Sequence, residues 1–154
     1  MSIQQKIKTV ILTNNNLTPL IARLALGTMI LPHGLQKTFG LFGGYGLSGT
    51  LGAFTEHMGI PWIFAFLAIM AEFLGGLGLI VGLFSRIASF GVGATMVVAM
   101  FMMHWQHGFF MNWYGNQKGE NIEFFILAIA LSLIVIIDGG GRFSMDNKLA
   151  KYLK

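Results

Sequence analysis

The chain has 154 residues, of which 55% are hydrophobic and only 10% are charged. Soluble globular domains carry roughly 25% charged residues, so this composition excludes an ordinary soluble globule and indicates an integral membrane protein. The formal net charge is +4, but most of the basic residues occur at chain ends and loops without interleaved aromatic residues, which argues against nucleic-acid binding. Cysteine is absent, which excludes disulfides, thiol nucleophiles, iron–sulfur ligation and c-type haem attachment.

Four apolar stretches follow one another, and we predict an all-α, integral membrane four-helix bundle. A helix rises about 1.5 Å per residue and a bilayer core is about 30 Å thick, so about 20 residues are needed for one crossing. Residues 17–146 are expected to form the membrane domain, between cytoplasmic tails at 1–16 and 147–154. The four helices are expected at residues 19–42, 61–84, 86–105 and 120–138.

The first helix is the most polar of the four, because Arg23, His33 and Lys37 interrupt it. Pro32 is expected to kink this helix, since proline removes a backbone N–H from the hydrogen-bond ladder. Arg23 and Lys37 fall on one helical face together with two glycines, and His33 lies at the edge of that face. This face is therefore suited to the interior of a bundle.

The connection after the first helix contains Gly44–Gly49, which fits the GxGxxG pattern literally. We reject a dinucleotide site, because that motif functions only between a strand and a helix of a βαβ unit. Leu47, Leu51, Phe54 and Met58 recur at helical spacing. This spacing predicts a short helix that lies on the outer membrane interface.

Glu72 is the one charged residue in Pro61–Phe84, an apolar stretch of 24 residues. An ionisable side chain near mid-membrane costs about 2.5–3.5 kcal/mol or more, so it normally faces a partner or a cavity. Gly75 and Gly76 share the helical face of Glu72 and permit a close approach of another helix. A GxxxG pattern at Gly78–Gly82 lies on a neighbouring face and is expected to be exposed, which would allow a homo-oligomer.

His104 lies near the outer end of the third helix, and Glu120 and Glu123 begin the fourth. Only 14 residues separate Glu123 from Asp138, or about 21 Å of helix, so one or both acids must lie in the headgroup zone or inside the bundle. Arg23 and Asp138 both fall near the inner end of their helices. We expect a structural ion pair between them, because burial of either charge alone would be costly.

The positive charges predict the orientation of these helices. They occur before the first helix, in the tight link after the second and after the fourth, which all lie on one side if four helices cross. We therefore expect both termini in the cytoplasm, with Lys118 as the single fixed positive charge of the outer connections. The cytoplasmic set comprises Lys6, Lys8, Arg86, Arg142, Lys148, Lys151 and Lys154.

The rise per residue along each helix places five polar side chains in the outer half of the membrane. We predict that they form one candidate ligand or proton site. Histidine or lysine would donate to a quinone carbonyl, and a carboxylate would relay the proton that accompanies reduction. In the alternative interpretation, Glu72 pairs with a nearby basic residue and only fixes helix register. The five candidates are His33, Lys37, Glu72, His104 and Glu123.

Two metal-containing sites are alternatives to the quinone site. Methionines near His104 are of the kind that suits Cu(I), but methionine is also ordinary apolar filling, and Met102 and Met103 point in different directions. A b-type haem between His33 and His104 is conceivable in a four-helix bundle, but both histidines have adequate acidic partners. We predict no metal site, and quinone is the one ligand that we expect.

Several short motifs occur in a fixed order along residues 20–146, and together they resemble the DoxX family. They are Arg23-x3-Gly27, His33-Gly34-x2-Lys37, Glu72-x2-Gly75-Gly76, Gly82-Leu83-Phe84-Ser85-Arg86, Gly119-Glu120 and Gly139-Gly140-Gly141-Arg142-Phe143-Ser144-Met145-Asp146. The resemblance implies a bacterial inner-membrane protein of four helices, from a family linked in some members to quinone-coupled sulfur oxidation and to redox or electrophile stress. The family pattern carries over to Arg23, His33, Lys37, Glu72, Arg86 and Asp146.

Two functional hypotheses follow. In the first, the protein is a quinone-interacting subunit or accessory of a redox or stress-response system, with a redox partner subunit that would carry any sulfur chemistry, because this chain lacks cysteine. In the second, it is a non-catalytic protein for small-molecule or lipid binding, transport or assembly, whose buried charges hold the helices together. The Gly-rich motif would turn the chain at the cytoplasmic face, where Ser144 or Asp146 would cap the segment Asn147–Lys154.

Overall fold

The computed structural model describes residues 11–152, so the expected tail residues 1–10 and the last two residues lie outside the described part. Within that part the chain is all-helical and has no strand, as predicted. Short 3-10 or π-helical segments join or extend the α-helices. They are η1 (Leu41–Gly43), η2 (Ala53–His57), η3 (Met100–His104) and η4 (Trp105–His107). The α-helices are α2 (Leu17–Phe39), α3 (Gly46–Gly52), α4 (Trp62–Val81), α5 (Ser85–Ala99), α6 (Glu123–Asp138) and α7 (Met145–Tyr152).

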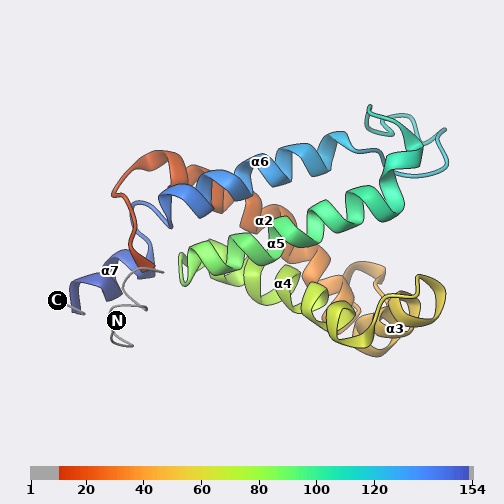
Figure 1. The fold of residues 1–154 in the computed structure, drawn as a ribbon, viewed down its shortest axis with the longest axis horizontal. Coiled ribbons are helices and arrows are strands. Elements are labelled where there is room, and N and C mark those ends of the chain that lie inside the picture. The colour runs from red at the N-terminus through yellow and green to blue at the C-terminus, as the bar shows by residue number, and fades with distance from the viewer. Residues whose placement is uncertain (1–10, 153–154) are drawn as a thin grey trace.

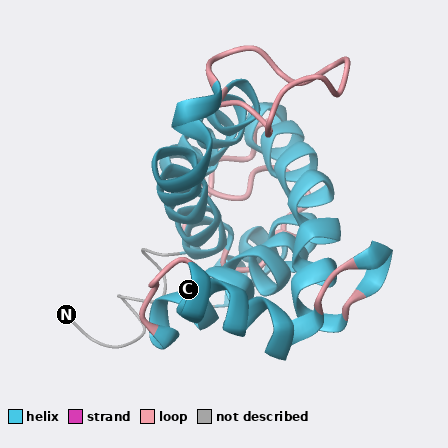
Figure 2. Cartoon of the chain, turned by 90° about the vertical axis from the view of Figure 1, so that its right-hand side faces the viewer, coloured by secondary structure: helices cyan, strands magenta, loops and turns pink. Residues whose placement is uncertain are grey.

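The four long helices pack in a closed arrangement, with α2 against α4, α4 against α5, α5 against α6, and α6 back against α2. Figure 1 shows that α7, the α4–α5 turn and the start of α2 lie at one end of this bundle, which we call the α7 end. The opposite end, which we call the α3 end, carries α3 and the connection between η4 and α6. Figure 2 looks at the molecule from that end and shows the helices around a common interior.

Two continuous helical stretches, Trp62–Val81 and Ser85–His107, are long and apolar enough to cross a membrane. The helix α2 has 23 residues but carries Arg23 and Lys37, and α6 has 16 residues. Large apolar side chains cover the outside of the bundle, and many of them are more than half exposed, as Phe90 is at 66%. An apolar outer surface of this kind is suited to lipid and not to water.

Left-handed glycines determine where two long helices end. The helix α2 continues through Pro32 and ends at Phe39, because Gly40 adopts a φ of 72° and its N–H donates to the carbonyl of Gln36. In the same way α4 ends before Gly82, which has a φ of 71°. Both helices therefore end three residues earlier than the expected positions 42 and 84.

The predicted short helix after α2 is present as α3 followed by the π-helical segment η2. Leu47 and Leu51 lie on α3, and Phe54 lies on η2. The backbone N–H of Ile60 donates to the carbonyl of Phe54 at 2.9 Å, which folds the chain back toward the start of α4. As a result, this connection lies at the α3 end of the bundle (Figure 1).

Glycines bring α2 and α4 into backbone contact. A Cβ atom added at Gly34 would lie 2.5 Å from Phe73 Cα, and one added at Gly76 would lie 3.0 Å from Leu31 Cα. Real side chains do not tolerate the first distance, so the helices could not approach this closely with alanine at position 34. The predicted use of small residues for close helix packing is thus present at the α2–α4 interface.

The GxxxG glycines of α4 pack inside this chain, and the expectation that they are exposed was wrong. A Cβ atom at Gly78 would lie 3.0 Å from the carbonyl oxygen of Leu83. One at Gly82 would lie 2.6 Å from Ser144 Cβ and 3.1 Å from Arg23 Cζ. The two glycines pack against the α4–α5 turn and the C-terminal segment, so they provide no argument for self-association.

Arg23 is buried at the α7 end and donates to backbone carbonyls instead of pairing with Asp138. Its Nε donates to Gly140 at 2.7 Å, and its Nη1 donates to Leu79 and Ile80 at 2.9 and 2.6 Å. Asp138 instead accepts a hydrogen bond from the side chain of Asn14. The expected ion pair is absent because the last carbonyls of α4 already satisfy the guanidinium, and a cation is favourable at a helix C-terminus.

Asp146 caps a different helix from the one that we expected. Its two carboxylate oxygens accept hydrogen bonds from the backbone N–H groups of Phe84 and Ser85, at 2.7 and 2.8 Å. These groups begin α5, where an anion is favoured by the helix dipole. Ser144 does cap α7, because its Oγ accepts a hydrogen bond from the Asn147 N–H at 3.1 Å.

Candidate functional site

A cavity of about 510 Å³ lies between the long helices toward the α3 end. Its volume falls within the roughly 300–1,000 Å³ of small-molecule sites, which are mostly apolar with a few polar groups. Residues of α2, α4, α5, η3 and α6 form its walls, and side chains from η2 and the turn after it cover it. The lining comprises Ile30, His33, Lys37, Phe54, Met58, Glu72, Met96, Met103, His104, Met111, Glu120, Phe124 and Phe125.

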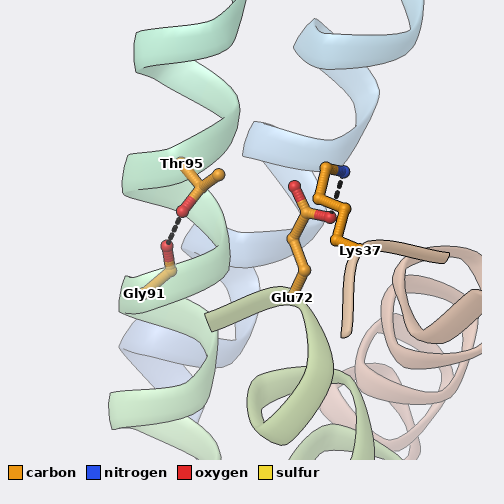
Figure 3. A network of polar contacts seen from close by, with 4 residues as sticks. All are labelled: Lys37, Glu72, Gly91 and Thr95. Carbon is orange, nitrogen blue, oxygen red and sulfur yellow. Dashed lines mark hydrogen bonds and ion pairs between the residues drawn. The ribbon is translucent and has the colours of Figure 1, made fainter. Parts of the chain in front are cut away.

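Lys37 and Glu72 form an ion pair in the wall of this cavity. Lys37 Nζ donates to Glu72 Oε2 at 2.5 Å, and the two side chains approach from α2 and α4 (Figure 3). The Glu72 side chain is 6% exposed and that of Lys37 is 26% exposed. No other ion pair occurs within residues 11–152. Thr95, also drawn in Figure 3, donates to the Gly91 carbonyl of its own helix.

Local packing positions this pair. Gly34 precedes Lys37 by one helical turn, and Phe73 follows Glu72 directly. The backbone contact between Gly34 and Phe73 therefore holds the two charged residues at the same level of the bundle. The predicted face of α4 that carries Glu72 is buried at Ala65, Gly75, Gly76 and Leu79, and Ile69 is buried beside them.

Two histidines contribute to the cavity wall from different helices. His33 lies on α2, and its ring meets that of Phe124 edge-on, with 6.3 Å between centroids. His104 lies at the end of η3, with its ring centroid 4.3 Å from that of Phe125. Because a carbonyl oxygen only accepts, His104 Nδ1 donates to the carbonyl of Glu120 at 2.8 Å. The Nε2 atom is then the acceptor nitrogen of the neutral imidazole.

Glu123 is placed next to the site but not in its lining. Its Oε2 accepts a hydrogen bond from the backbone N–H of Met111 at 3.1 Å, and Met111 does line the cavity. The structure therefore brings His33, Lys37, Glu72 and His104 to one cavity, while Glu123 fixes the connection that contributes part of its wall.

Several lining residues were not predicted from the sequence. The backbone carbonyl of Glu120 holds His104, and Phe54 and Met58 cover the cavity from η2 and the turn after it. The apolar repeat that contains Phe54 and Met58 was a usable signal, because an apolar helical face requires a covering surface. Met96 and Met103 contribute to the apolar wall.

The arrangement combines hydrogen-bond donors, an acid and an apolar interior. A lysine ammonium has three N–H donors, and one hydrogen bond of Lys37 is made within the described part of the chain. Acceptor oxygens of a ligand could therefore bind to Lys37 while its rings or chains contact Met and Phe side chains. Glu72 and His104 carry side chains of the types that act as general acids and bases.

These features define a helical membrane protein with a polar site in a mostly apolar cavity near one end of the bundle. The DoxX family profile matches residues 18–105, which is more than half of the chain. The chain belongs to the DoxX family, and the resemblance inferred from the motifs is confirmed.

A relative supports the membrane location. The inner membrane protein YqjF of Escherichia coli strain K12 is 30% identical over 136 residues, which cover 86% of this chain and 92% of that protein. No solved structure matches the chain significantly. The profile match includes Arg23, His33, Lys37 and Glu72 and ends before Asp146.

Proposed function

We propose that this protein binds the head group of a membrane quinone in the cavity and acts as a subunit or accessory of a redox or stress-response system. The observation that carries the proposal is the Lys37–Glu72 ion pair in the wall of an otherwise mostly apolar cavity of about 510 Å³. A quinone joins carbonyl acceptors to an apolar ring and chain, and this cavity offers donors beside Met and Phe side chains.

Lys37 is the proposed donor to one quinone carbonyl. Its ammonium keeps further N–H donors beyond the one directed at Glu72, and its side chain is the more exposed of the pair. Reduction of a quinone to a quinol takes up two electrons and two protons. Glu72 and His104 would relay the protons, and a redox partner subunit would supply the electrons.

The proposed topology has four crossings, formed by α2, α4, the stretch Ser85–His107 and α6, in a bacterial inner membrane. Arg86, Arg142 and Lys148 belong to the α7 end, and Lys118 belongs to the connection at the α3 end. This charge distribution supports a cytoplasmic α7 end.

Single-cysteine labelling tests the topology, because the natural chain has no cysteine. Lys118 and Lys148 are both exposed. A membrane-impermeant maleimide should label the Lys118→Cys protein in intact spheroplasts and the Lys148→Cys protein only after permeabilisation. Labelling of Lys148→Cys in intact spheroplasts would overturn the proposed orientation.

A lipid extract of the purified protein tests the ligand. Mass spectrometry should find quinone with the wild type, and the Glu72→Gln and Lys37→Met proteins should retain at least tenfold less. Glu56→Gln is the matched control, because Glu56 is exposed on η2 and does not line the cavity. Equal quinone content in all four proteins, or none in the wild type, would contradict the proposal.

One observation favours the alternative of a non-catalytic binding or assembly protein. The buried charges of Arg23, Glu72 and Asp146 all have hydrogen-bond partners inside the chain, as charges with a purely structural role would. In that case Glu72→Gln would lower the thermal midpoint of the protein and leave its bound lipids and any redox response unchanged.

A further inference from the structure

A second cavity of about 380 Å³ adjoins the first at the α3 end. Its walls come from η2 and the turn after it on one side and from the end of α5, η3 and η4 on the other. We call it the side cavity, and we call the larger one the head-group cavity. Three residues, Phe54, Met58 and Met103, line both of them. These three side chains therefore form the partition between two adjoining spaces.

The side cavity reaches the outer surface of the bundle. Val98 and Met102 line it and are 51% and 53% exposed, on the flank of α5 and η3. At the α3 end its lining becomes polar through Gln106 and His107 of η4. A space with apolar walls on the lipid side and polar groups toward the outer boundary matches the environment of a lipid-soluble chain near its head group.

The partition consists of side chains that can move without a change in the backbone. Methionine has three rotatable side-chain bonds and adapts to different neighbours, and two of the three partition residues are methionines. Both backbone segments here, η2 and η3, are π-helical, a geometry that is frequent at functional sites. The partition thus differs from the α2–α4 interface, where backbone packs on backbone.

We infer that the side cavity holds the apolar chain of the quinone whose head group occupies the head-group cavity, and that the chain passes between Phe54, Met58 and Met103. This inference rests on the proposed function and adds to it a route by which the ligand enters from the lipid. Because the same three movable side chains line both cavities, their displacement would join the two spaces into one that suits a single amphiphilic occupant.

Two quinone probes distinguish binding of the apolar chain from binding of the head group. One is a head-group benzoquinone without a chain, and the other carries the same head group and a ten-carbon chain. Burial of each CH₂ is worth about 0.8 kcal/mol, so partial burial of the chain should tighten binding to the wild type by about tenfold or more. Binding is measured with the full-length protein in nanodiscs.

Ala99 offers a variant that fills the side cavity alone, because it lines that space and not the head-group cavity. Ala99→Phe should weaken binding of the chain-bearing probe about tenfold and change binding of the head-group probe less than twofold. Ala94→Phe is the matched control, since Ala94 is exposed on the same helix and lines neither space. If Ala99→Phe fails to fold, Val98→Phe tests the same space from its more exposed rim.

The outcomes distinguish the inference from the proposed function. If the wild type binds both probes equally, or Ala99→Phe weakens both alike or neither, the side cavity does not hold the chain although the quinone site stands. If neither probe binds to the wild type, the quinone site itself is wrong and the inference falls with it.

Discussion

Gly34 and Phe73 are in backbone contact: a Cβ atom at position 34 would lie 2.5 Å from both the Cα and the N atom of Phe73. This contact sets the distance between α2 and α4 one turn away from Lys37 and directly beside Glu72. The helix spacing that brings Lys37 and Glu72 together therefore depends on the absence of a side chain at position 34.

Gly34→Ala should destabilise the protein by about 1–3 kcal/mol, because overpacking forces α2 away from α4. It should also reduce quinone content, since Lys37 moves away from Glu72. Gly52→Ala is the control, because its added methyl group would meet nothing within 4 Å and its backbone is helical. Thermal midpoints in detergent check both variants, and equal midpoints would show that the helices tolerate the methyl group.

The Lys37–Glu72 pair should show strong coupling in a double-mutant cycle. Glu72→Leu and Lys37→Met alone each leave one charge without its partner and should cost about 1–3 kcal/mol. The double variant should be more stable than either single variant, because it leaves neither charge behind. Denaturation in mixed micelles measures all four proteins, and simple additivity would argue against the ion pair.

Asp146→Ala should destabilise the protein by about 0.5–2 kcal/mol through loss of the cap on α5. Its carboxylate accepts hydrogen bonds from Phe84 and Ser85, which lie 61 or more positions earlier in the chain. Hydrogen exchange at the start of α5 should accelerate in this variant. Asn147→Ala is the neighbouring control, because the Asn147 side chain donates only to the side chain of Asn15 at an exposed site, and its backbone N–H is kept.

Arg23→Lys should cost about 1.5–3 kcal/mol although the charge is kept. The guanidinium reaches carbonyls of Leu79, Ile80 and Gly140 at once, and a lysine ammonium does not reproduce that planar geometry. Arg142→Lys is the control at an exposed position. A thermal midpoint of Arg23→Lys equal to that of Arg142→Lys would show that charge alone suffices.

Helical periodicity predicted the interior faces of α2 and α4 well, because the membrane leaves few alternatives to regular helices, but not that of α6, where Phe125, Ala128, Ser132 and Val135 are buried and Leu127 is 61% exposed. The face of α4 with Ala65, Glu72 and Gly75 is buried as expected, and so are Arg23 and Gly27 on α2. Counting along the helices also placed Lys37 and Glu72 near enough to meet.

The partners of buried charges were harder to predict, because backbone acceptors become visible only after helices are placed in space. Arg23 and Asp138 do both belong to the α7 end, yet the carbonyls at the end of α4 are closer partners for Arg23. The cover of the head-group cavity was missed for a related reason. The repeat of Phe54 and Met58 indicates a helix but does not say against which surface it packs.

The contact between Asp146 and the α4–α5 turn has a consequence for biosynthesis. When Phe84 and Ser85 are added to the chain, only two of the four long helices have been synthesised, but the acceptor for their N–H groups is supplied by residue 146. The turn between α4 and α5 therefore cannot complete its hydrogen bonds until α6 and the segment up to residue 146 have been synthesised. Completion of this turn is thus coupled to translation of all four long helices.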